Sequence, residues 1–176
     1  MSYSEGQERP LEADEQELLE LLRSEAREVL EAGAATLALT WTRVGDNLSW
    51  PQFELRPRRS ECLGLALAGG GGDLIDTTLI VDGEEAANFE LWQPTGEELL
   101  AAARERIRAV IGGRAELELT RYWRVWTIVA TFEVPGGPDE TSRGPCKPAE
   151  YRRFFPVQPG DESSGLLGPR RFPPYM

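Results

Sequence analysis

Histidine is absent from this sequence of 176 residues, and cysteine and lysine are scarce. Cys62 and Cys146 are the only cysteines, and Lys147 is the only lysine. Without histidine the chain cannot form a Ser-His-Asp or Cys-His catalytic set, and it lacks a principal ligand of zinc and iron. Two cysteines are too few for a Cys₄ zinc site or an iron–sulfur cluster. We therefore expect no metal or redox cofactor, and we expect a binding protein rather than an enzyme.

Long apolar runs are also missing, so nothing in the sequence predicts a membrane-spanning helix. The N-terminal residues are acidic and polar, unlike a secretory signal peptide. We therefore expect a cytoplasmic protein whose two cysteines are free thiols. The net charge is −11. This acidic excess argues against nucleic acid or anionic membrane as the partner, so we expect a protein partner; a homo-oligomer stays open.

The most regular stretch is residues 115–134, which are rich in β-branched and aromatic side chains. Leu117 and Leu119 place its first apolar face on odd numbers, whereas Ile128 and Phe132 place the second on even numbers. Since side chains alternate along a strand, one strand cannot have both phases. The switch predicts two strands joined by a tight turn near residues 120–124.

Two amphipathic helices are predicted by apolar residues that repeat at intervals of three and four. The first begins at Asp14, with Glu17 completing a capping box, and ends at Gly33. The second begins at Thr95, with Glu98 as its capping partner, and ends at glycines 112–113. Apolar and alternating segments at 35–44, 48–56, 62–68, 74–81 and 88–93 predict further strands.

Together these segments predict an α+β fold, an antiparallel sheet of about six or seven strands with both helices on one face. We expect a flexible leader at 1–13, a single domain at 14–134, and an extended tail at 135–176, where proline and glycine crowd. The tail is predicted to be a recognition arm outside the core. The predicted core residues are Leu22, Val29, Leu37, Leu39, Trp41, Ile107, Leu119, Ile128 and Phe132.

Aromatic residues beside arginines mark the candidate partner-binding sites, because Trp, Tyr and Arg are enriched at interface hot spots. The candidates are Arg121, Tyr122, Trp123, Arg124, Tyr151, Arg152, Arg153, Phe154, Phe155, Arg170, Arg171, Phe172 and Tyr175. Two alternatives remain open: the first cluster is cation–π packing, or the tail docks on its own acidic domain.

The leading hypothesis is a non-catalytic protein-binding module, by analogy with small acidic α+β proteins that act as adaptors, chaperones or immunity proteins. The alternative is a ligand-binding domain or hydrolase that uses strand carboxylates such as Asp76 and Asp82 with the arginine loop at 56–59. Such a hydrolase would need two carboxylates at a defined separation in a cleft.

Overall fold

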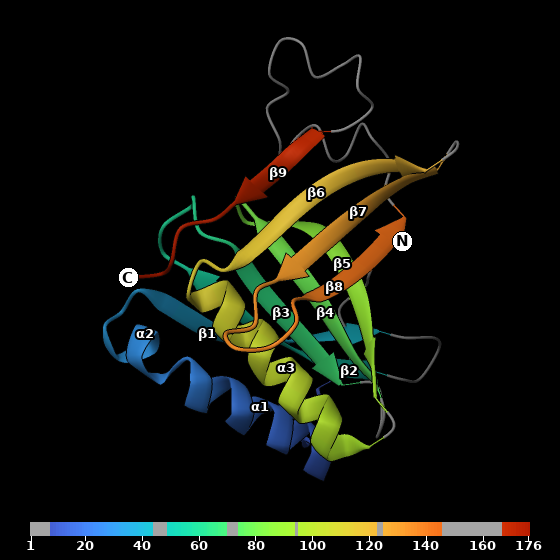
Figure 1. Cartoon of the computed structure of the whole chain (residues 1–176). Coiled ribbons are helices and arrows are strands. Elements are labelled where there is room, and N and C mark those ends of the chain that lie inside the picture. The colour runs from blue at the N-terminus through green and yellow to red at the C-terminus, as the bar shows by residue number, and fades with distance from the viewer. Residues whose placement is uncertain (1–7, 44–48, 70–73, 94, 123–124, 146–166) are drawn as a thin grey trace.

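The computed structural model describes residues 8–43, 49–69, 74–93, 95–122, 125–145 and 167–176. In chain order the elements are α1 (Ala13–Glu25), α2 (Arg27–Glu31), β1 (Ala35–Arg43), β2 (Ser49–Pro57), β3 (Gly64–Gly69), β4 (Leu74–Val81), β5 (Glu84–Trp92), α3 (Gly96–Ile111), β6 (Ala115–Tyr122), β7 (Val125–Phe132), β8 (Glu140–Pro145) and β9 (Leu167–Arg171). The α+β class is therefore confirmed (Figure 1).

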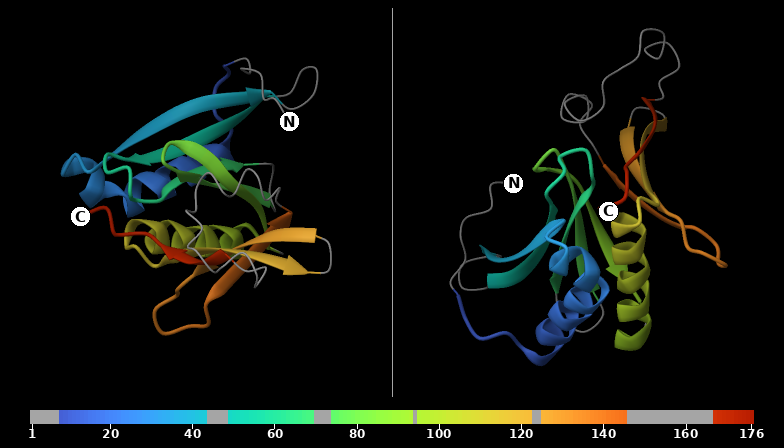
Figure 2. Two further views of the ribbon diagram at one scale, coloured as in Figure 1. Left: turned by 90° about the horizontal axis from the view of Figure 1, so that it is seen from above. Right: turned by 90° about the vertical axis from the view of Figure 1, so that its left-hand side faces the viewer.

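The strands form two antiparallel sheets rather than the single sheet predicted. One has the order β1-β2-β3-β4-β5, and the other has the order β8-β7-β6-β9. The predicted number of six or seven strands is wrong for the described residues, because β8 and β9 come from the segment interpreted as a tail. The edge strands β5 and β8 approach closely, and α3 contacts strands of both sheets (Figures 1 and 2). Helix α3 is therefore the central element around which the sheets are arranged.

The first helix differs from its prediction at its start and in its middle. It begins one residue before Asp14, and Glu12 is the N-cap. The carboxylate of Glu15 accepts a hydrogen bond of 2.7 Å from the backbone N–H of Glu12, so Asp14 and Glu17 are not the capping pair. The helix breaks at Ala26, which separates α1 from α2, and Gly33 adopts φ +65° after α2.

The start of the second predicted helix is confirmed. The hydroxyl of Thr95 accepts a hydrogen bond of 3.2 Å from the backbone N–H of Glu98. At its end Gly113 adopts φ +67°, and a Cβ there would lie 2.6 Å from the backbone nitrogen of Pro174. Only glycine fits both the left-handed backbone and this close approach of the C-terminal segment.

The two-strand interpretation of residues 115–134 is confirmed. Strands β6 and β7 pair in one continuous antiparallel register, from Ala115 opposite Phe132 to Tyr122 opposite Val125. Both predicted apolar faces point into the core, as the complete burial of Leu119 and Phe132 shows. The connecting residues 123–124 lie outside the described part of the chain.

Six of the nine predicted core residues are buried, namely Leu22, Val29, Ile107, Leu119, Ile128 and Phe132. The three exceptions all lie on β1. Leu37 and Trp41 are half-buried, and Leu39 is 45% exposed, so its prediction is wrong. The alternation was assigned correctly, but β1 is the last strand of its sheet. An edge position leaves the middle of β1 incompletely covered.

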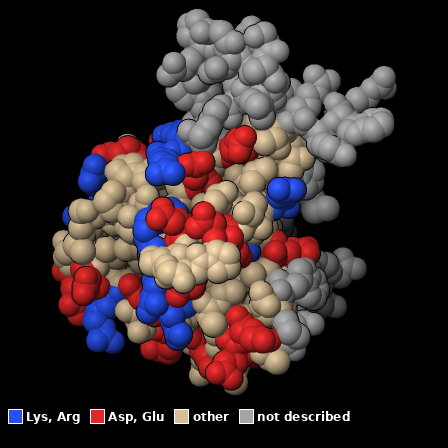
Figure 3. Space-filling view, viewed as in Figure 1, with Lys and Arg blue, Asp and Glu red and all other residues tan. Residues whose placement is uncertain are grey.

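Ion pairs join α1 to α3. Glu25 of α1 forms ion pairs with Arg104 at 3.1 Å and Arg108 at 2.7 Å, both on α3. The acidic face of α1 is therefore not entirely solvated, although exposed pairs of this kind contribute little stability. On the face of the molecule drawn in Figure 3, acidic and basic side chains lie interspersed rather than in separate patches.

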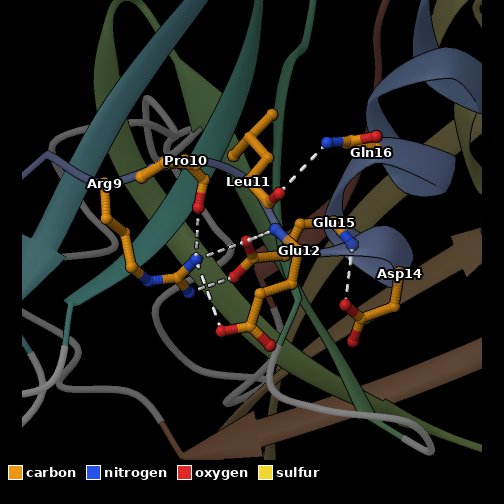
Figure 4. A network of polar contacts seen from close by, with 7 residues as sticks. All are labelled: Arg9, Pro10, Leu11, Glu12, Asp14, Glu15 and Gln16. Carbon is orange, nitrogen blue, oxygen red and sulfur yellow. Dashed lines mark hydrogen bonds and ion pairs between the residues drawn. The ribbon is translucent and has the colours of Figure 1, made fainter.

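Within the predicted leader, residues 8–12 lie against the domain through Arg9 (Figure 4). Its guanidinium donates to the carboxylate of Glu15 at 2.8 Å and lies 5.3 Å from the ring centroid of Trp41. Glu15 is buried and also accepts the Glu12 N–H. Arg9 therefore links the beginning of α1 to the helix-facing side of β1.

A buried arginine on α3 connects the two sheets. Arg106 is 2% exposed. Its guanidinium donates to Thr77 of β4 at 2.9 Å, and to Ser142 and Glu140 of β8 at 2.7 Å each. It also lies 5.2 Å from the ring centroid of Phe132. Arg106 thus supplies a donor to the buried hydroxyls of Thr77 and Ser142, and the carboxylate of Glu140 compensates its charge.

Replacing Arg106 by leucine is expected to lower the free energy of unfolding by roughly 3–5 kcal/mol, the usual cost of removing one partner from a buried ion pair. The cost arises because half-buried Glu140 would lose its counter-charge, and Thr77 and Ser142 would be left buried without their donor. Urea unfolding measures it. The matched control is Arg104→Leu, which removes an exposed ion pair and should cost less than about 1 kcal/mol. Equal effects of the two substitutions would contradict a bridging role for Arg106.

Candidate functional site

The candidate partner-binding residues of the sequence fall into three groups in the structure. Trp123, Arg124 and the cluster at 151–155 lie outside the described residues. Arg121 and Tyr122 end β6, but only their backbone is described. Arg170, Arg171, Phe172 and Tyr175 are described in full. The first two groups therefore stay predictions, and only the last group can be compared with the structure.

Phe172 and Tyr175 belong to the core and not to a binding surface. They are 3% and 2% exposed. The hydroxyl of Tyr175 donates to the carbonyl oxygen of Leu63 at 2.7 Å. The backbone N–H of Tyr175 donates to the carbonyl oxygen of Ile111 at 3.0 Å. The prediction that the chain beyond residue 134 lies outside the core is therefore wrong for these residues. The alternative in which this segment docks on its own domain holds for residues 167–176.

The two arginines before Phe172 also contact their own domain. Arg171 is largely exposed, and its guanidinium donates to the carboxylate of Glu116 at 2.7 Å. The guanidinium of Arg170 lies 4.9 Å from the ring centroid of Phe172. The ion pair with Glu116 joins β9 to β6, the strand with which it pairs, whereas the Arg170–Phe172 contact is local to the C-terminal segment.

A groove of about 630 Å³ opens where the outer face of the four-stranded sheet meets the turn between β7 and β8. Three carboxylates line it, those of Glu116, Glu133 and Asp139. Arg171 neutralises Glu116, whereas Glu133 and Asp139 form no ion pair with a described residue. Arg114 lies at the groove and donates to the backbone carbonyl of Glu133 at 2.9 Å rather than to its carboxylate, which acts on Arg171 by its charge without forming an ion pair with it.

The sequence contained a weak signal for this groove. Pro135, Gly136 and Gly137 form a turn, and acidic residues stand on either side of it. A turn flanked by carboxylates at a sheet end presents them together. The crowding of proline and glycine from Pro135 onward predicts an irregular tail instead, so the sequence does not identify this site.

The carboxylates of the alternative hypothesis are not brought together. Asp76 lies in β4 opposite Glu90, whereas Asp82 follows the end of β4 in a tight turn with φ 53°. The two are six positions apart along extended backbone, a distance of about 20 Å. Arg56 is bound to Glu54 through a 2.5 Å hydrogen bond. The distance between Asp76 and Asp82 is too large for the paired carboxylates of a glycosidase.

Cys62 lines a separate depression of about 360 Å³ together with Arg56 and Glu85. The side chain is 2% exposed. Its thiol donates to the carbonyl oxygen of Pro174 at 3.4 Å, and burial raises its pKa. A buried thiol with a raised pKa is a weak nucleophile, so Cys62 is a structural residue. Cys146 lies outside the described residues.

Within the described part of the chain, no three Cys, Asp or Glu side chains converge in an arrangement that could hold a metal ion. None of the described helices is both long enough and apolar enough to span a membrane. No protein-family model, curated protein or solved structure matches this chain, so no family is assigned.

Replacing Tyr175 by phenylalanine is expected to lower the free energy of unfolding by about 1–3 kcal/mol, because the carbonyl of Leu63 loses its buried donor. Burial raises the pKa of Tyr175 well above its usual value. The folded protein therefore keeps this proton when the unfolded chain releases it, so wild-type stability should fall as the pH rises above about 10. Urea unfolding on both sides of this pH should show a smaller decline for Tyr175→Phe. A parallel decline would contradict the burial of this hydroxyl.

Replacing Asp76 by asparagine is expected to stabilise the protein at neutral pH. Burial, and secondarily the carboxylate of Glu90, raise the pKa of Asp76. A raised carboxyl pKa means that ionisation opposes folding, so the loss of stability develops as the pH rises through that pKa. The gain from Asp76→Asn should therefore be largest at pH 7 and should disappear below about pH 4. Thermal unfolding at the two pH values tests this, and an equal gain at both pH values would contradict it.

Proposed function

We propose that this chain is a non-catalytic protein-binding module that receives a basic segment of its partner on the outer face of the four-stranded sheet. The observation that carries the proposal is the groove, which opens on the face opposite α3 and contains two carboxylates without ion-pair partners among the described residues. An adaptor, chaperone or immunity protein would be consistent with such a surface. The cytoplasmic location expected from the sequence stays a prediction.

The chemistry of the groove favours a segment that contains arginine or lysine. Carboxylates accept charge-assisted hydrogen bonds from guanidinium and ammonium groups, and guanidinium can bind in a bidentate manner. Glu133 and Asp139 are both exposed and lie at the same groove. The net charge of −11 would add long-range attraction for a basic partner and would increase the rate of association.

Catalysis is a weaker interpretation of the same surface. Thr131 supplies the only side-chain hydroxyl of the groove lining, and the chain has no histidine to activate it. The lining also contains no lysine or cysteine. The groove supplies carboxylates at the end of the sheet, which suit the binding of a basic segment of a partner.

The test reverses charge in the groove through Glu133→Lys combined with Asp139→Lys. We expect capture of protein partners from a lysate of the native host to weaken about tenfold, equivalent to 1.4 kcal/mol. The fold should be unaffected, because both side chains are exposed and the Arg114 hydrogen bond uses the backbone of Glu133. Quantitative mass spectrometry of captured proteins, with the melting temperature measured in parallel, gives the result.

The matched control is Glu28→Lys combined with Glu31→Lys on α2. These two acids are also exposed, and the net charge changes by the same amount. If the control variant loses capture as strongly as the groove variant, the effect is one of net charge and the groove is not the binding site.

A further inference from the structure

The outer edge of β1 is built in a way that most edge strands avoid. Edge strands are usually protected by charged residues, prolines or bulges, since unpaired backbone groups invite another strand. Residues 35–42 of β1 contain no charged residue and no proline. The pairing of β1 with β2 runs over the whole strand without a register shift. No described strand pairs with the other edge of β1, which forms the rim of its sheet (Figure 2).

The other outer edges contrast with β1. Strand β9 carries Pro169, Arg170 and Arg171, two of the protective devices. Strands β5 and β8 lie against each other, and a Cβ added at Gly144 of β8 would lie 3.3 Å from the backbone oxygen of Asn88 of β5. Among the described strands, β1 is therefore the edge that is both open and unprotected.

The backbone of β1 also has the correct alternation for accepting a strand. The carbonyl of Ala34 accepts a 2.9 Å hydrogen bond from Arg58, which continues the pairing with β2. Successive residues direct their backbone groups to opposite sides, so even-numbered residues face β2 and odd-numbered residues face outward. The N–H and C=O of Leu37, Leu39 and Trp41 therefore point to the open edge.

The side chains of the same residues supply an apolar contact. Leu39 is 45% exposed, one of two large hydrophobic side chains exposed among the described residues. Leu37 and Trp41 are half-buried on the same face of the strand, and the guanidinium of Arg9, paired with Glu15, lies over the Trp41 ring. An exposed leucine flanked by partly covered apolar residues on an open strand is a site where added apolar surface would be stabilising.

We propose that β1 pairs with β1 of a second copy of this chain, antiparallel about a two-fold axis at Leu39, to make one ten-stranded sheet. This register places Leu39 opposite Leu39 of the partner and Leu37 opposite Trp41 of the partner, so apolar side chains meet across the axis. The segment 35–42 is uncharged, whereas the whole chain carries −11. It therefore offers a strand on which two acidic copies can meet without like charges directly opposed.

The helix layer permits this arrangement. Helix α2 lies at the Ala35 end of β1, where the backbone N–H of Ala34 donates to the carbonyl oxygen of Val29 at 2.8 Å. A two-fold axis at Leu39 places the partner's α2 at the opposite end of the paired strands. The two short helices are therefore separated along the strand direction. Since strand pairing alone buries less than the roughly 1,600 Å² of a standard interface, we expect a micromolar dissociation constant.

Analytical ultracentrifugation from low to high micromolar concentration is the first test. We expect a monomer–dimer equilibrium that Leu39→Asp shifts to monomer, since two carboxylates would lie directly opposite each other. Ala101→Asp, which adds the same charge at an exposed position of α3, should leave the dimer intact. A chain that remains monomeric throughout, or a dimer that Leu39→Asp does not weaken, would overturn the proposal.

Disulfide trapping tests the register. In a Cys146→Ser background, Leu39→Cys should form a covalent dimer on mild oxidation, because opposed residues of such a pair lie about 5.5 Å apart at Cα, within disulfide range. Thr36→Cys is the control, since its two copies would lie about 20 Å apart along the strands. Cross-linking of both cysteines to the same extent, or of neither, would contradict a two-fold axis at Leu39. Neither experiment involves the groove at Glu133, so each proposal can fail independently.

Discussion

The fold depends on one buried charge. Among the described residues the two sheets share no backbone ladder, and they meet through α3 and along the adjacent edges of β5 and β8. Arg106 reaches from α3 to both β4 and β8, and its partners are themselves buried or half-buried. A guanidinium in this position is costly to desolvate, and each of its three nitrogens donates to a side chain of β4 or β8. Such a side chain fixes the relative position of the sheets more specifically than apolar packing would.

The C-terminal residues complete the core around this bridge. Phe172 and Tyr175 are buried beside elements that are far away in the sequence, and the backbone of the segment passes so close to Gly113 that no side chain fits there. The end of α3, the segment 172–176 and the residues before β3 are therefore mutually dependent. A proline-rich segment suits this role, because its limited conformational freedom reduces the entropy lost on docking.

Local patterns predicted local structure well. The phase switch between Leu119 and Ile128 identified a hairpin, and the Thr95 capping box identified the start of α3, because both depend on nearest neighbours in the chain. The prediction that Leu39 is buried failed because alternation assigns a face but not a position in the sheet. Arg106 falls three residues after Ala103 on the apolar stripe of α3, which is a signal for burial. Its hydroxyl partners are about thirty residues away, and no local pattern could have identified them.

The prediction of an irregular tail at 135–176 is wrong for its described strands, because it rests on the proline and glycine content of the segment and not on the spacing of its side chains. Nine of the thirteen prolines lie from residue 135 onward, which predicted an irregular arm. The same segment contains β8, in which Glu140 and Ser142 lie two residues apart on the face that contacts Arg106. It also contains Phe172 and Tyr175, an aromatic pair three residues apart near its end. The groove between β7 and β8 was overlooked for the same reason. Its carboxylates are contributed by β6 and by the connection between β7 and β8, so only the assembled sheet shows that they share one surface.

The distribution of protected and open edges also limits how far the chain can assemble. Strand addition at an open edge produces fibres when a second open edge remains for the next copy. Pairing of β1 with β1 is isologous, so it consumes the same edge on both copies and closes at two. The next exposed edge, β9, carries a proline and two arginines, and β5 and β8 protect each other. An unprotected edge on an acidic body is therefore compatible with a closed dimer and not with an open filament.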